Sequence, residues 1–165
     1  MTAPSVVRQL HASLSARAPE QLITVLQEAG YAAGEGLYHA FAAVHNPADL
    51  DADQLAPALS EFFTTGGWGA VTVTPVGTGA LAIDSSNWSE AEPGTAQSPM
   101  CFFSAGMLAD FLGRLSDETV AVLEVECRSR GDTRCRFLSA TPEVLEKVYN
   151  EMTAGRSYAE ALGAS

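Results

Sequence analysis

Three cysteines and one glutamate in the second half of the chain have the types and spacing of a zinc site. They are Cys101, Glu124, Cys127 and Cys135, and the three cysteines are the only ones in the sequence. An odd number of thiols does not form a closed set of disulfides. Thiolates and a carboxylate can together complete a tetrahedral zinc shell. A shell without an open position cannot activate water, so the pattern indicates a metal that stabilises the fold.

The spacing alone also allows a simpler interpretation, in which the cysteines are small core residues. Two cysteines eight positions apart are a weaker metal signal than a Cys-x-x-Cys pair. Glu126 is a rival to Glu124 as the carboxylate ligand, because both are expected on one side of a strand. His39 and His45 are possible substitutes, although a histidine beside apolar helix residues is more often buried and hydrogen-bonded. The residues by themselves leave these alternatives open.

Composition limits the classes of function that the chain can have. With 165 residues, 47% hydrophobic and 18% charged, it is typical of one globular domain over 1–165. We expect N-terminal helices over 4–65, a zinc-containing α/β core over 66–155 and a short C-terminal helix over 156–163. The net charge of −11 argues against binding to nucleic acid or to anionic lipid. No membrane span or signal peptide is evident, so we expect a cytoplasmic protein with reduced thiols.

The N-terminal helices contain an unusual set of glycines. Apolar residues at helical spacing predict a helix over 4–17 and a second one from Pro19 to about Asn46. Gly30, Gly34 and Gly36 fall inside the second helix, where each costs roughly 1 kcal/mol relative to alanine. Close approach of another backbone or a ligand would explain them, and so would a break near Gly30. Both explanations remain open at this level.

The central part of the chain predicts a helix, a hairpin and a loop. Asp51 or Asp53 can cap a third helix, which ends at Gly66. Alternating apolar residues over 71–83 predict a β-hairpin. Residues 85–99 are rich in Ser, Glu, Gly and Pro, which is typical of an irregular loop.

The elements that must position the candidate ligands follow this loop. Ser98-Pro99 predicts the start of a helix that runs to about Leu115, with Cys101 in its first turn, where the helix dipole favours a thiolate. Strands over 119–127 and 134–140 form a second hairpin. Glu124 and Cys127 have opposite parity on an ideal strand, so we expect a bulge between them. A last helix over 142–152 and a final turn over 158–162 complete an α+β fold, in which two hairpins form a four-stranded antiparallel sheet flanked by helices.

Two stretches around these residues resemble the 4-vinyl-reductase-type domain, which also forms the sensor of phenol- and xylene-responsive bacterial activators. The resemblance covers about 35–155. It implies a zinc bound by the matching Cys, Glu, Cys and Cys, a fold related to vesicle-tethering subunits, and a homodimer. The stretches are Pro99-Met-Cys101-Phe-Phe-Ser-Ala-Gly106-Met-Leu and Val122-Leu-Glu124-x-x-Cys127-x-x-x-Gly131-Asp132-x-x-Cys135-Arg-Phe137.

The resemblance also implies an apolar or aromatic ligand. Trp88 is similar to the tryptophan that lines the aromatic pocket of the sensors, whereas no histidine of this chain matches their phenol-contacting one. Side chains recurring every four residues on the helix after Cys101 belong to a core more often than to a pocket, but the resemblance favours a pocket. The predicted lining consists of Tyr38, Phe62, Trp68, Trp88, Phe103, Met107 and Phe111.

No catalytic constellation is present in the sequence. Glu90 and Glu92 are two loop carboxylates that we expect to be solvated, and no phosphate loop, dinucleotide fingerprint or nucleophile elbow occurs. Unlike the activators, the chain shows no ATPase domain and no DNA-binding helices after residue 140, so we expect it to act through a partner protein or by carrying the ligand itself.

The sequence therefore predicts a stand-alone domain that binds or senses a small apolar molecule, such as a hydrocarbon, with a structural zinc. Two alternatives remain. One is an accessory factor in tetrapyrrole or bacteriochlorophyll synthesis, and the other is a dimeric adaptor without a ligand.

Overall fold

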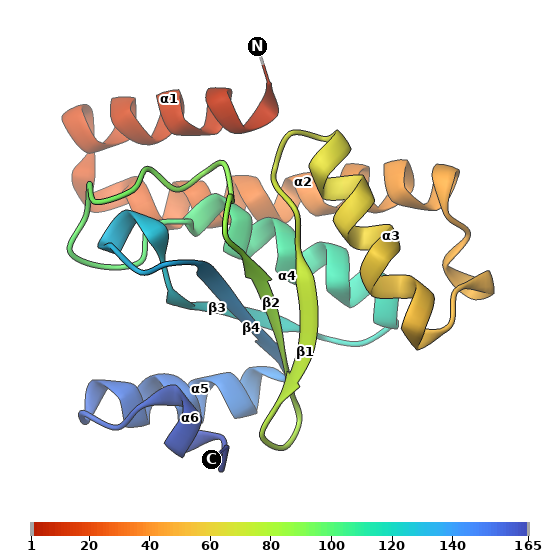
Figure 1. Cartoon of the computed structure of the whole chain (residues 1–165). Helices are drawn as coiled ribbons and strands as arrows, with labels where there is room; N and C mark the ends of the chain where they lie inside the picture. The colour runs from red at the N-terminus through yellow and green to blue at the C-terminus, as the bar shows by residue number, and fades with distance from the viewer. Residues whose placement is uncertain (1, 165) are drawn as a thin grey trace.

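The computed structural model describes residues 2–164 and contains one sheet with helices on both faces (Figure 1). The strands are β1 (Thr72–Val76), β2 (Ala80–Ser85), β3 (Ala121–Glu126) and β4 (Cys135–Ala140). The α-helices are α1 (Ala3–Arg17), α2 (Leu22–Val44), α3 (Ala52–Thr65), α4 (Phe102–Ser116), α5 (Pro142–Thr153) and α6 (Tyr158–Ala161). Short 3-10 helices are η1 (Pro19–Gln21), η2 (Pro47–Asp49) and η3 (Arg128–Arg130).

The two predicted hairpins lie side by side in a single antiparallel sheet. The strand order is β1-β2-β4-β3, and β2 pairs with β4 in the register Ile83↔Phe137. Figure 1 shows α2 and α4 behind one face of the sheet and α5 with α6 on the other. The predicted α+β class and the four-stranded antiparallel sheet are thus confirmed.

The sheet has a buried core on each face because its side chains alternate in direction. On the α4 side, Ile83 and Phe137 pack against aromatic residues of α2, α3 and α4. On the α5 side, Ala82 and Leu138 pack against Leu145 and other apolar residues of α5 and α6. Among residues 2–164, no helix has the length and apolar character needed to cross a membrane.

Helix α2 runs without a break through its glycines. A Cβ added at Gly30 would overlap the backbone carbonyl of Phe103, and one at Gly34 would overlap Asp110 on α4. A Cβ at Gly36 would meet nothing within 4 Å. Close approach therefore explains Gly30 and Gly34, while the alternative of a break near Gly30 is wrong.

Helix α4 begins later than the sequence predicts. Ser98-Pro99 does not start it; its N-cap is Cys101, whose side chain makes no capping hydrogen bond. For α3, in contrast, Asp51 is the cap and forms a capping box with Gln54. Proline tolerates several turn conformations besides the first helical turn, so the Ser-Pro signature misplaced the start of α4 by three residues.

Candidate functional site: a cysteine–glutamate cluster

Three elements bring the four predicted metal ligands together. Cys101 precedes α4, Glu124 lies in β3, Cys127 follows that strand, and Cys135 opens β4. One ligand atom from each residue lies within 4.8 Å of the others, and all four residues are buried. The cysteines are free thiols.

The expected bulge in β3 places Glu124 and Cys127 on one side. Glu124 pairs with Phe137 and Glu126 with the adjacent Arg136, so two residues of β3 oppose one residue of β4. The extra residue reverses the parity of the strand after Glu124. It also overturns the expectation that Glu126 faces the same side as Glu124.

Glu126 instead takes part in an ion-pair network beyond the cluster. Its carboxylate accepts hydrogen bonds from Arg134 and, at 2.6 Å, from the hydroxyl of Tyr158. It is therefore not a rival ligand. His39 and His45 lie on and just after α2, and neither belongs to the cluster.

The distances within the cluster fit a tetrahedral metal shell. With zinc–sulfur bonds of about 2.3 Å, two thiolates of a tetrahedron lie about 3.8 Å apart. The Sγ atoms of Cys101 and Cys127 are 4.0 Å apart. Glu124 Oε2 accepts a hydrogen bond of 2.9 Å from the backbone N–H of Cys101, whereas its Oε1 is buried without a hydrogen-bond partner. A bound cation would satisfy that second oxygen.

Without a cation, the cluster holds its negative charge unevenly. Hydrogen bonds from the thiols of Cys101 and Cys135 lower the pKa of Cys127. The contact with Cys127 raises the pKa of Cys101. Burial, with the nearby charge of Cys127, raises the pKa of Glu124 to about 8. A divalent cation would instead lower the pKa of every ligand, because it stabilises each deprotonated form.

The turn between Cys127 and Cys135 is fixed by its own hydrogen bonds. Asp132 Oδ2 accepts a 2.8 Å bond from the backbone N–H of Cys127 and two further bonds from the guanidinium of Arg130. Gly131 has φ 106°, a conformation that favours glycine. The turn therefore holds Cys127 in place whatever the state of the thiols.

Glu90 is a structural residue of the loop whose role the sequence did not predict. Its carboxylate accepts backbone hydrogen bonds from Phe103 at 3.1 Å and Ser104 at 2.8 Å, and a short one from the Ser104 hydroxyl. It thus caps α4 in place of Ser98. The side chain is only 7% exposed, so the expectation of a solvated Glu90 is wrong; Glu92 is exposed, as expected.

The seven residues predicted to line a ligand pocket lie on the α4 side of the sheet. Several of their aromatic rings contact one another. Trp68 stacks on both Trp88 and Phe103, while Phe111 contacts Tyr38 and Phe62. Trp88 is fully buried, and its Nε1 donates a 2.8 Å hydrogen bond to Ser104. These rings fill the space between the helices and the sheet, so their role in binding stays a prediction.

An apolar cavity lies next to this aromatic cluster, with a volume of about 310 Å³. It is bounded by α3, the second half of α4 and the first hairpin. Sequence reasoning missed it because its walls come from four separate elements; the one available signal was Leu81, an apolar residue that is 45% exposed. Its main apolar lining residues are Leu55, Leu59, Val73, Leu81, Leu112 and Leu115.

A family model covers the part of the chain that holds the cluster. Residues 85–140 match the model of the 4-vinyl-reductase domain, abbreviated V-4-R. This part of the chain is similar to the 4-vinyl-reductase domain. The matched range contains all four residues of the cluster together with Trp88 and Glu90. Comparison with curated protein sequences gives no significant match.

Two solved structures share the fold of this chain over most of its length. The phenol-responsive sensory domain of the transcription activator PoxR, solved with phenol, superposes with a TM-score of 0.69 at 16% identity, over 93% of this chain and 81% of that chain. Subunit 3 of a trafficking protein particle complex from Naegleria fowleri, covalently bound to palmitic acid, gives a TM-score of 0.62 at 14% identity, over 83% and 93%. At these identities the likeness establishes the fold.

A vinyl-4-reductase family protein from Methanocaldococcus jannaschii is 25% identical over 50% of this chain and 55% of that chain, with a TM-score of 0.43.

Proposed function

We propose that the chain binds and senses a small apolar or aromatic molecule, with a structural zinc in the cysteine–glutamate cluster. The observation that carries this proposal is the apolar cavity beside α4, in a chain whose residues 85–140 match the 4-vinyl-reductase model. Two proteins of the same fold hold an apolar group: the PoxR sensory domain was solved with phenol, and the trafficking subunit with palmitic acid.

The chemistry of the cavity supports a small, mainly apolar ligand. Aliphatic side chains dominate its walls, and a few polar groups such as Ser139 and Thr141 lie among them. Such a mixture is typical of small-molecule sites, where polar groups orient a ligand that apolar contacts bind. The volume of about 310 Å³ is at the lower end for such sites and favours a single aromatic ring over a tetrapyrrole.

Zinc would act on the site indirectly. Its four ligands would join the start of α4 to the end of β3 and the start of β4. Leu112 and Leu115 of the same helix line the cavity. A metal that anchors α4 therefore keeps one wall of the cavity in place, and its loss is expected to weaken ligand binding together with stability.

The test is calorimetric titration with phenol and with a series of alkyl-substituted phenols and benzenes. Wild type is expected to bind at least one member. Leu81→Gln, which places an amide at the cavity mouth, is expected to weaken binding at least tenfold. Tyr149→Gln is the matched control, because Tyr149 is also exposed, at 59%, but lies on α5. Equal binding by both variants would place the ligand elsewhere.

A ligand-free adaptor is the second candidate, favoured by the solid packing around Trp88. It would be supported if no compound in the series bound to zinc-loaded protein. The homodimer implied by the sequence resemblance also remains a prediction, and light scattering of the purified chain tests it.

A further inference from the structure

Strand β3 forms one edge of the sheet and has no protection along its first half. Within residues 2–164 it pairs with β4 alone. Its exposed edge begins with Ala121, Val122 and Leu123, all half-buried and without charge. The opposite edge strand β1 contains Pro75, a residue that discourages further pairing. An apolar edge strand that lacks proline or charged residues can pair with a strand of another chain.

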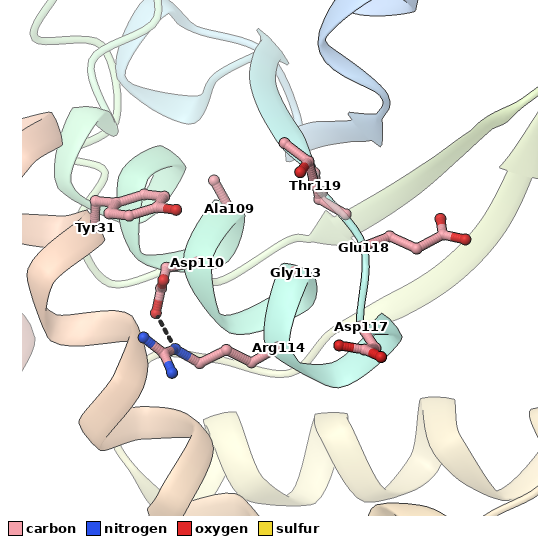
Figure 2. Close-up of a pocket in the computed structure, with 9 residues that line it drawn as sticks. Tyr31, Ala109, Asp110, Gly113, Arg114, Asp117, Glu118 and Thr119 are labelled. Atoms are coloured by element: carbon pink, nitrogen blue, oxygen red, sulfur yellow. Dashed lines mark hydrogen bonds and ion pairs between the residues drawn. The ribbon is translucent and has the colours of Figure 1, made fainter.

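An apolar groove of about 500 Å³ follows this edge between β3 and the helices α2 and α4. The groove is hollow on the side of α4 because the side chains there, Ala105 and Ala109, are small. Tyr31 of α2, which is 56% exposed, also lines the groove, and Figure 2 shows its ring directed toward Ala109 of α4. The groove continues past the end of α4 into a second hollow that is lined by Asp117 and Glu118 (Figure 2).

The charges along the groove are mainly negative. Glu28 lies at the part next to the start of α4, and Asp117 with Glu118 lie beyond its end. These three carboxylates form no ion pair within the described chain, whereas the one cation of the groove, Arg114, is paired with Asp110 at 2.8 Å and lies 3.6 Å from Glu35. Apolar in the middle and acidic at both ends, the groove is complementary to a segment with the reverse charge.

We propose that this groove binds an extended segment of a different protein, apolar at its centre and basic at both ends, which adds a strand to β3. Strand addition provides backbone hydrogen bonds for affinity, and the groove selects the side chains. Gly106 of α4 lines the groove together with Glu28, and Asp117 directly follows the last residue of α4. At a rise of 1.5 Å per helical residue, these two positions lie about 16 Å apart. About five extended residues span that distance.

Charge also argues against a second copy of this chain as the occupant. A two-fold interface sets the same surface of both copies face to face, so the unpaired carboxylates would meet one another.

A segment bound in the groove would contact the same helix that borders the ligand cavity. Helix α4 borders both sites: Ala109 lines the groove, and Leu112, three residues later, lines the cavity. A shift of α4 when a ligand enters the cavity would therefore alter the groove.

The test uses a fluorescent peptide with a Val-Thr-Val-Thr-Val centre and two lysines at each end, and a control peptide with glutamates in place of the lysines. Fluorescence anisotropy with the full chain is expected to show saturable binding of the basic peptide alone, weakened by added salt. Glu28→Lys and Glu118→Lys should each reduce affinity about fivefold. Glu146→Lys, an exposed change on α5, should leave it unchanged.

Ala109→Trp should abolish binding, because the indole fills the groove from a half-buried position. Circular dichroism and melting temperature verify that each variant is folded. Failure of the basic peptide to bind wild type, or equal affinity for the basic and acidic peptides, overturns the proposal. A wild-type dimer that Ala109→Trp converts to a monomer also overturns it, because a second copy would then occupy the groove.

Discussion

The backbone carbonyl of Phe103 on α4 lies directly against Gly30 on α2, with no room for a side chain between them. Gly106 of α4 makes the reciprocal approach to the backbone of Gln27. The two helices thus pack backbone to backbone at the end where α4 starts. This contact sets the position of Cys101, one residue before α4, relative to the rest of the fold.

Gly30→Ala is expected to destabilise the protein by about 3 kcal/mol, because the added methyl group forces the two backbones apart. Gly36→Ala on the same helix is the matched control. Its Cβ would meet nothing within 4 Å, so it should stabilise the protein by roughly 0.5–1 kcal/mol through helix propensity. Urea denaturation of both variants measures the difference. Similar effects from the two substitutions would contradict the close packing.

Glu124→Gln is expected to reduce bound zinc well below one per chain and to lower the free energy of unfolding by several kcal/mol, because a structural zinc contributes to folding. Elemental analysis and denaturation provide the two measurements. Glu126→Gln is the control, because Glu126 pairs with Arg134 and Tyr158 rather than with the thiols, and it should retain the metal. Equal zinc in wild type and Glu124→Gln would exclude Glu124 as a ligand.

Stability is expected to depend on pH through Glu90, because burial raises the pKa of this carboxyl from 4.5 to about 7. Below pH 4.5 the group is protonated in both the folded and the unfolded chain, so it does not make the free energy of unfolding depend on pH. Between pH 4.5 and about 7 the unfolded chain releases the proton while the folded chain retains it. The free energy of unfolding therefore falls by a total of roughly 3 kcal/mol as pH rises through this range.

The measurement is the free energy of unfolding at pH 5 and pH 8 for wild type, Glu90→Gln and Glu92→Gln. Wild type and Glu92→Gln should lose more stability towards high pH than Glu90→Gln, which has no proton to release. An identical pH dependence in all three proteins would show that Glu90 is ionised throughout the range.

The sequence alone determined the elements and the candidate metal ligands. Alternation and helical spacing are local properties, so both hairpins and the main helices could be predicted. The four candidate ligands could be predicted because few residue types bind zinc, and a short turn necessarily brings Cys127 and Cys135 close. The opposite parity of Glu124 and Cys127 even indicated the bulge that the structure contains.

The way in which distant segments meet could not be predicted from local sequence patterns. Glu90 caps a helix that starts twelve residues later in the chain, and no spacing rule connects a loop carboxylate with such a helix. Leu55, Leu81 and Leu115 face one cavity because α3, β2 and α4 meet there, and each residue alone is typical of an ordinary core position. Burial and open edges depend on what packs against a residue, which the local sequence does not specify.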